Sequence, residues 1–291
     1  MRLISYHDDG ASPRAGILVG DKVVDPQRAG AAAEIDSPPE TVRGLIGLSS
    51  EARDRLGAAA AGEDGVELGG LRLAPPVPDP QKILCIGLNY SEHAAEAEKE
   101  EPDSPIVFTK FRTSLLGSGE TFRLPAPNPG WVDWEGELAV VIGRRAEAVS
   151  AAEALDHVAG YMPFNDLSAR DLQLASPQWT MGKAFDGSGP CGPALVMADE
   201  VPDPQDLRLR TLLNGEVMQE DTTASMIFSV AELIAYISSL ITLETGDVIA
   251  TGTPSGVGYA RDPKRFLAAG DTIEVEIDGL GKLSNNVEES R

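Results

Sequence analysis

Two glutamates separated by a single glycine are the residues of this chain that could most clearly bind a metal ion. Glu135 and Glu137 lie in the run 131–142, whose second half is rich in β-branched and aliphatic residues and predicts a buried strand. Side chains alternate between the faces of a strand, so both carboxylates should point the same way, while Gly136 leaves the opposite face open. Buried carboxylates repel each other, and a cation that prefers oxygen ligands removes that cost. The alternative is a solvated edge strand with two surface acids.

A third acid could complete this set. Asp166 follows a predicted strand at 160–165, so it could provide another carboxylate beside Glu135 and Glu137. In the alternative interpretation Asp166 caps a helix, and Arg170 pairs with it one turn later.

Two further stretches could hold an anion. Lys183 is a single lysine among mostly apolar residues at 179–185. If it is buried, its ammonium needs an anion and would suit a developing enolate; otherwise it is a surface lysine with a snorkelling stem. The segment 251–258 follows a strand, and its glycines would let backbone N–H groups approach an anion, unless it is only a turn.

The elements around these residues predict a strand-rich α/β chain in two domains. The proline-rich segment 75–80 is stiff and can continue neither a helix nor a sheet, so we place the boundary there. Residues 1–75 then form a small N-terminal domain, and residues 76–291 form the main domain. Strands outnumber helices and do not alternate regularly with them, which favours a mixed sheet over a doubly wound one.

Two of the helices expected in the main domain have a clear N-terminal cap. Ser91 should cap a polar helix that runs to about Glu100, and its polar surface offers little to dock it, so we expect it to be mobile unless a ligand stabilises it. Ser229 opens a capping box for a second helix, which should end near Leu243 and carry Leu240 in its apolar stripe.

Composition limits the classes of function. The 291 residues include 46 acidic and 24 basic ones, and the net charge of -22 argues against nucleic acids and anionic membranes as partners. The two cysteines lack the spacing of zinc or redox motifs, and dinucleotide, phosphate-loop and nucleophile-elbow motifs are absent. No signal peptide or membrane-spanning run is found, which favours a cytosolic enzyme or binding protein.

Several motifs, taken in order, resemble the fumarylacetoacetate hydrolase superfamily. They are Gly87-Leu-Asn-Tyr-x-x-His93-x-x-Glu96, Glu135-x-Glu137, Asn165-Asp166-x-Ser-x-Arg170-Asp-x-Gln173, Gly182-Lys183 and Thr251-Gly-Thr-Pro254. The likeness covers residues 82–288, and the first 75 residues resemble the small variable domain of many bacterial members. It implies a catalytic domain built as a mixed β-sheet roll, a small α+β N-terminal domain and a homodimer.

The resemblance also implies roles for individual residues. Mg²⁺, or else Mn²⁺ or Ca²⁺, would be held by Glu135, Glu137 and Asp166. The oxygen atoms of a 2-oxo acid substrate would be held by Arg170, Gln173, Lys183 and Thr253. His93 and Glu96 would orient and deprotonate water, and Lys183 would assist catalysis. The animal hydrolase supplies a fourth carboxylate near the position of Asn89, where this chain has none, so water or substrate would fill that place.

These residue types fit the chemistry of 2-oxo acids. Such an acid chelates a cation through its carboxylate and ketone oxygens, and the cation stabilises the enolate formed when a bond to C3 breaks. If His93 and Glu96 activate water, the reaction is hydrolysis of a carbon–carbon bond in a 2,4-dioxo acid of the acylpyruvate or fumarylpyruvate type, as in aromatic catabolism. We favour this reaction because the His-x-x-Glu pair is present.

Two alternatives stay open. Without attack by water, the same site would decarboxylate oxaloacetate or shift a double bond, as an isomerase of the 5-carboxymethyl-2-hydroxymuconate type does. A non-catalytic protein that binds divalent cations would explain the acids, but it would not explain Lys183 together with Arg170.

Overall fold

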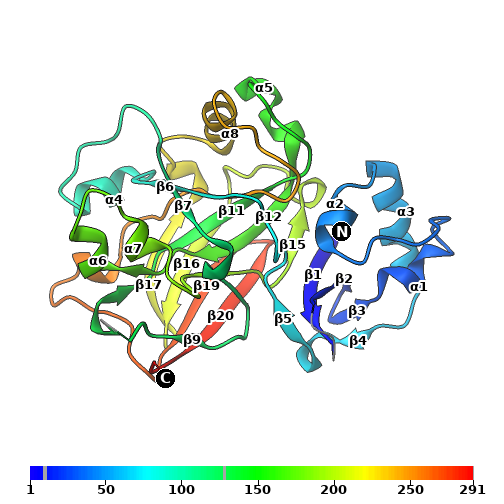
Figure 1. Ribbon diagram of the computed structural model, residues 1–291, viewed down its shortest axis with the longest axis horizontal. Helices are drawn as coiled ribbons and strands as arrows, with labels where there is room; N and C mark the ends of the chain where they lie inside the picture. Colours follow the sequence, from blue (N-terminus) through cyan, green and yellow to red (C-terminus); the bar gives the residue numbers. More distant parts are fainter. Residues whose placement is uncertain (9–11, 127–128, 291) are drawn as a thin grey trace.

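A large mixed sheet forms the centre of the computed structural model, which describes residues 1–8, 12–126 and 129–290 (Figure 1). The main path of this 13-stranded sheet runs through β4 (Val66–Glu67), β3 (Lys22–Val24), β2 (Arg14–Val19), β1 (Arg2–His7), β15 (Leu195–Met197), β12 (Val158–Asn165), β11 (Gly136–Ile142), β18 (Val248–Ala250), β6 (Ile83–Gly87) and β7 (Ile106–Lys110). Off this path lie β5 (Arg72–Ala74), β8 (Leu115–Gly117) and β14 (Gly189–Cys191). Most neighbours are antiparallel, but β18 runs parallel to β6 and β14 runs parallel to β8. The predicted mixed, strand-rich fold is confirmed.

A second sheet covers one face of the first. Its five strands follow the order β17 (Glu216–Thr222), β16 (Arg208–Leu213), β19 (Thr272–Ile277), β20 (Gly281–Glu288) and β9 (Phe122–Arg123). Val140 of β11 packs in one apolar cluster with Leu209 and Val275 of this sheet. The next residue, Val141, packs in a cluster on the opposite face. β11 is therefore a central strand buried on both faces, as its run of aliphatic residues predicts.

The face opposite the two glutamates is not open. A Cβ atom added to Gly136 would lie 2.1 Å from Oγ1 of Thr211, which belongs to β16. The expectation of an open face is wrong, because the second sheet packs directly on this glycine. Only a residue without a side chain lets the two sheets approach so closely at this point.

The N-terminal part continues the large sheet. β1 pairs with β15 of the main part, and the helices α1 (Pro26–Gly30), α2 (Val42–Ile46) and α3 (Ser50–Ala60) lie beside β1–β3 (Figure 1). Because the ladder crosses from β1 to β15, strands from both predicted domains share one sheet. The division into two domains after residue 75 stays a prediction.

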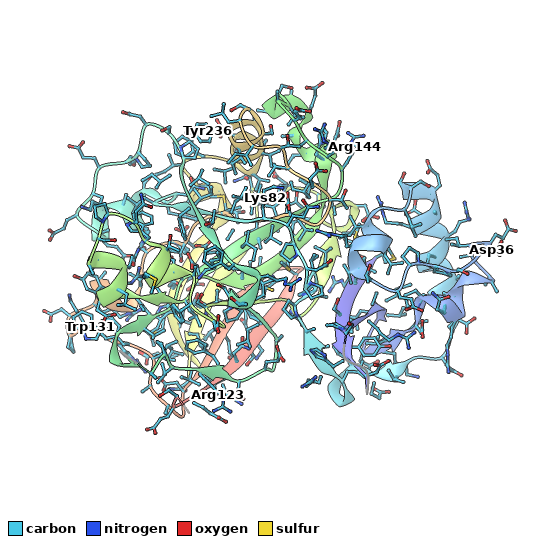
Figure 2. The ribbon with its side chains drawn as sticks, viewed as in Figure 1. Asp36, Lys82, Arg123, Trp131, Arg144 and Tyr236 are labelled. Carbon is cyan, nitrogen blue, oxygen red and sulfur yellow. The ribbon has the colours of Figure 1, made fainter. Side chains whose placement is uncertain are left out.

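The helices of the main part are short. They are α4 (Ser91–Glu96), α5 (Ala151–Ala154), α6 (Arg170–Leu174), α7 (Thr180–Lys183) and α8 (Val230–Ser238). Short 3₁₀ turns occupy Leu68–Gly70, Arg112–Ser114, Pro129–Trp131, Leu155–His157, Ala198–Glu200, Thr223–Ser225 and Gly258–Ala260. Figure 2 shows Tyr236 of α8 and Arg144 near α5 at the outer side of the molecule. None of the helices in the part of the chain that the structure describes is long and apolar enough to cross a membrane.

The helix α8 begins as predicted but ends early. Ser229 forms the expected capping box. The helix ends at Ser238 and not near Leu243, and Leu240, expected in the apolar stripe, is 93% exposed. The reason is a distant partner, since Leu243 leaves the helical path to form a β-bridge with Ala146.

Candidate active site

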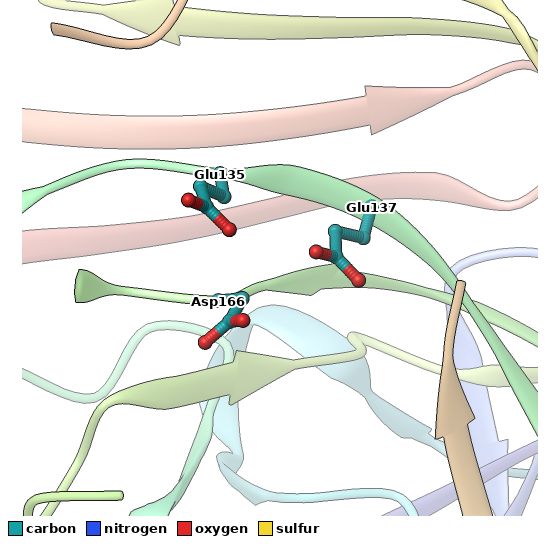
Figure 3. Close-up of side chains that lie close together, drawn as sticks. All are labelled: Glu135, Glu137 and Asp166. Atoms are coloured by element: carbon teal, nitrogen blue, oxygen red, sulfur yellow. The ribbon is translucent and has the colours of Figure 1, made fainter. Parts of the chain in front are cut away.

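Three acids lie together where β11 and β12 meet (Figure 3). Glu135 precedes β11, Glu137 is the second residue of that strand, and Asp166 follows β12 directly. All three are buried, and one carboxylate oxygen from each lies within 4.8 Å of the others. The amide of Asp166 donates to the carbonyl oxygen of Glu135 at 2.9 Å, which fixes their spacing through the backbone. The arrangement could hold a metal ion, and the assignment of these residues as ligands stays a prediction.

Two buried lysines contact Asp166 through different oxygens. The ammonium of Lys183, at the end of α7, lies 2.9 Å from Oδ2 of Asp166 and 2.6 Å from Oε2 of Glu135. Lys183 is 2% exposed, so it is not a surface lysine. The ammonium of Lys110 lies 2.7 Å from Oδ1 of Asp166 and donates to the carbonyl oxygen of Ser188 at 2.9 Å. The sequence analysis missed Lys110, and its one signal is a single charge at the end of the apolar strand 105–110.

Glu137 has no positively charged partner of its own. It forms no ion pair with any described residue, and its carboxylate accepts a hydrogen bond from the amide of Gly252 at 2.9 Å. Burial raises the pKa of Glu137 well above its usual value, and the neighbouring charges of Asp166 and Glu135 raise it further. Burial would also raise the pKa of Glu135, but Lys183 and then Arg170 outweigh it and lower that pKa to about 2. An added cation would therefore stabilise Glu137 most.

A fourth buried acid fixes the position of Arg170. Asp133 is fully buried and accepts a hydrogen bond from Nε of Arg170 at 2.8 Å. It also accepts from the backbone amides of Gly258 at 2.7 Å and Tyr259 at 2.9 Å. Asp133 thus joins the loop after β18 to the arginine. The spacing of two residues from Asp133 to Glu135 was the sequence signal that could have identified Asp133. In the structure, however, Asp133 belongs to β10 (Val132–Asp133), which is separate from β11 and pairs with β13 (Ser168–Ala169).

Arg170 begins α6 but does not pair with Asp166. Its guanidinium lies 2.6 Å from Oε1 of Glu135 and donates to Oε1 of Gln173 at 2.9 Å. The residue at the N-cap is Ala169, which has no side-chain cap bond. The alternative in which Asp166 caps this helix is wrong, because its carboxylate is engaged by the two lysines.

His93 and Glu96 form a contact one helical turn apart on α4. Nδ1 of His93 lies 2.7 Å from Oε1 of Glu96, and Oε2 of Glu96 accepts from the amide of Gly256 at 2.9 Å. The expectation that little docks this helix is wrong, because that bond ties it to the loop after β18. The helix also ends at Glu96, not near Glu100, and its N-cap residue is Tyr90 and not Ser91. Its mobility stays a prediction.

Thr253 and Asn89 are bound mainly by the protein itself. Oγ1 of Thr253 donates to the carbonyl oxygen of Gly136 at 2.9 Å and accepts from Nε2 of Gln219 at 2.8 Å. The amide nitrogen of Asn89 donates to the carbonyl oxygens of Thr251 at 2.8 Å and Phe228 at 3.0 Å. The side chain of Asn89 therefore supports the backbone of two loops.

A cavity of about 620 Å³ brings most of the predicted residues together. Its polar lining includes His93, Glu96, Glu135, Arg170, Gln173, Lys183 and Thr253. Glu137 and Asp166 are buried and do not line it, but Asp166 contacts Lys183, which does. Phe108 and Trp179, whose rings meet edge to face at 5.5 Å, contribute apolar wall that the sequence analysis did not assign. The cavity can therefore take a small molecule with both polar and apolar parts.

Comparisons with known proteins identify the family of this chain. A family model described as Fumarylacetoacetate (FAA) hydrolase C-terminal matches residues 82–288. A mitochondrial oxaloacetate tautomerase of Xenopus laevis is 39% identical over 293 residues, which span 99% of this chain and 90% of that protein. The crystal structure of a putative HpcE protein from Mycobacterium smegmatis is 41% identical with a TM-score of 0.87, and the match covers all of both chains.

A further solved structure contains a metal. Maleylpyruvate hydrolase from Sphingobium sp. SYK-6, in complex with manganese(II) and pyruvate, is 30% identical with a TM-score of 0.82, and the match covers all of both chains. The family match extends over more than half of the chain, and it includes every residue assigned to the cavity and the acidic cluster. The chain belongs to the fumarylacetoacetate hydrolase family.

Proposed function

We propose that this protein is an enzyme that interconverts the enol and keto forms of a 2-oxo acid of the oxaloacetate type, with a divalent cation as cofactor. The observation that carries the proposal is the buried cluster of Glu135, Glu137 and Asp166 beside the ammonium of Lys183, next to a cavity. The name of the Xenopus laevis relative supports the substrate and the reaction. Of the reactions that the sequence leaves open, this name favours isomerisation over hydrolysis.

We propose Mg²⁺ as the cation, with Mn²⁺ or Ca²⁺ as alternatives, held by Glu135, Glu137 and Asp166. Three carboxylates are the ligands that hard cations prefer, and Glu137 has no other positive partner. The manganese(II) ion in the structure of maleylpyruvate hydrolase supports a divalent cation in this family. When bound, the cation would supply Lewis-acid polarisation of the 2-oxo group.

The protein's own side chains suit the two proton positions of a tautomerisation. The reaction moves one proton between C3 and the oxygen on C2, so it needs a base near the carbon and a positive group near the oxygen. Glu96 accepts from Nδ1 of His93, which leaves Nε2 to take the proton and return it. Lys183 suits the oxygen, where negative charge develops. The cavity residues Arg170, Gln173 and Thr253 would hold the remaining substrate oxygens.

The pair His93 and Glu96 also favours a second candidate, hydrolysis of a carbon–carbon bond in a 2,4-dioxo acid. If Nε2 takes a proton from water, the resulting hydroxide can attack the C4 carbonyl carbon. The bond from C4 to C3 then breaks, its electron pair stays on C3 as an enolate, and C3 takes up the proton from Nε2. The 30% identity to maleylpyruvate hydrolase supports this candidate. Decarboxylation of oxaloacetate would break the corresponding bond without water. A non-catalytic cation-binding protein would not need Lys183 at the cavity.

Three direct assays separate these reactions. They follow ketonisation of enol-oxaloacetate by its ultraviolet absorbance, formation of pyruvate from oxaloacetate, and loss of acetylpyruvate, each with Mg²⁺ and with a chelator. The double variant Glu135→Gln/Glu137→Gln serves as the matched blank. We expect Mg²⁺-dependent ketonisation above the blank. Equal rates for wild type and blank in all three assays would refute an enzymatic role, and acetylpyruvate hydrolysis alone would establish the second candidate.

Two further expectations belong to this proposal, a homodimer and a cytosolic location. Light scattering coupled to size exclusion tests the first, with a mass of twice 30.7 kDa expected. Fractionation of the source cells tests the second.

A further inference from the structure

Two lysines at the cavity differ from its buried bases because no acid neutralises them. Lys99 and Lys264 both line the cavity and are exposed. Within residues 1–8, 12–126 and 129–290, neither forms an ion pair, whereas Arg170 and Lys183 each contact two acids. Glu98 is an exposed acid in the same lining. In a chain with 46 acidic and 24 basic residues, two unpaired ammonium groups at one cavity suggest that an anion from outside completes them.

Lys264 is held in place by an aromatic ring. Its ammonium lies 3.5 Å from the ring centroid of Tyr259, a distance that favours a cation–π interaction. The amide of Tyr259 in turn donates to Asp133, which also binds Arg170. These contacts connect the ring beneath Lys264 to the acid that binds Arg170. Because Lys264 already contacts the ring, its side chain loses less entropy when an anion binds than a lysine without such a contact would lose.

The two ends of the cavity differ in burial. Glu135 is 5% exposed and Lys183 is 2% exposed, so they mark the closed end, whereas Lys99 and Lys264 are exposed and mark the open end. A substrate whose 2-oxo acid group lies at the closed end must extend its other end toward the opening. The exposed apolar residue Leu174 also lines the cavity, but the two free cations there match a negative charge.

We infer that Lys264, held over Tyr259, binds the distal carboxylate of a 2-oxo dicarboxylic acid, with Lys99 adding positive charge at the same opening. The inference rests on the proposed function for the position of the 2-oxo group. It adds to that function a residue outside the acidic cluster that would recognise the dicarboxylic substrate class.

The test uses the Mg²⁺-loaded full-length enzyme and two substrates of matched shape, oxaloacetate and its 4-methyl ester. Lys264→Gln should raise KM for oxaloacetate about tenfold, the usual size of one hydrogen bond to a charged group, and leave kcat unchanged. The constants for the ester should stay within about twofold of wild type, because the ester has no distal charge. The control Lys22→Gln, at an exposed residue of β3 away from the cavity, alters net charge equally and should change nothing.

A binding measurement separates this inference from the proposed function. Calorimetric titration with L-malate and with its 4-methyl ester needs no turnover. Wild type should bind malate more tightly than the ester, and Lys264→Gln should lose most of that preference. If wild type turns over neither substrate but shows this preference, the proposed function is wrong and the distal site stands. An unchanged preference in the variant, or equal changes in KM for both substrates, would refute the distal site.

Discussion

Replacing Glu137 by glutamine should change the stability of the protein in opposite directions with and without a divalent cation. The side chain is 1% exposed, accepts one hydrogen bond from Gly252 and has no ion pair among the described residues. Its pKa in the folded protein is raised, chiefly by burial. An acid of this kind costs no stability below its unfolded pKa and opposes folding increasingly as the pH rises toward its folded pKa. At neutral pH, glutamine removes this penalty, so the cation-free variant should be more stable than wild type.

The magnitude follows from two opposing effects. An unpaired buried polar group costs about 1–3 kcal/mol, which is the gain expected for the variant without cation. A cation at 1,000 times its Kd stabilises a single site by about 4.1 kcal/mol. The neutral amide is a poorer ligand than a carboxylate, so the variant should gain little at the same concentration. With Mg²⁺ the wild type should therefore become the more stable protein by about 1–3 kcal/mol.

Thermal unfolding at pH 7.5 measures the stability difference between variant and wild type, once with chelator and once with Mg²⁺. Each kcal/mol corresponds to about 2 °C in a protein of this size. Glu63→Gln, at an exposed acid without an ion pair, is the matched control and should shift neither melting temperature. A Glu137→Gln variant that melts below wild type in chelator, or that responds to Mg²⁺ as strongly as wild type, would refute the reasoning.

Other substitutions test the remaining groups. Lys183→Met should lower turnover by about 30- to 1,000-fold, which is the usual contribution of one group that stabilises a developing anion. Circular dichroism should show a retained fold, and wild-type turnover in the variant would mean that Lys183 has only a structural role. His93→Ala should cut any acylpyruvate hydrolysis by about 10²–10⁴-fold and oxaloacetate decarboxylation much less, and equal losses would mean that His93 serves closure or the fold. Asp133→Asn should raise KM through loss of a charged partner of Arg170 and leave the Mn²⁺ affinity, measured by electron paramagnetic resonance, nearly unchanged; a parallel loss of Mn²⁺ affinity would contradict this.

The sequence predicted the parts of the site that depend on local periodicity. Glu135 and Glu137 face the same way because a strand repeats every two residues, and this holds whatever the strand packs against. Lys110 was not predicted because its partner, Asp166, follows a different strand, and no local sequence pattern connects the two residues. The early end of α8 has the same cause, since the bridge between Leu243 and Ala146 is a long-range contact. Local patterns fix direction and element type, while tertiary partners decide where elements end and which charges are paired.

The charges buried at the site argue that cation and substrate bind interdependently. Four acids, Asp133, Glu135, Glu137 and Asp166, meet three bases, Lys110, Arg170 and Lys183. The raised pKa of Glu137 favours a retained proton, which balances the set without cation, so cation affinity should weaken as the pH falls. A divalent cation that displaces this proton leaves one positive charge, which the carboxylate of a 2-oxo acid would balance in the low dielectric of the interior. A second carboxylate on the substrate would add one more negative charge than this balance needs. The unpaired ammonium of Lys264 at the opening is placed to pair with that charge.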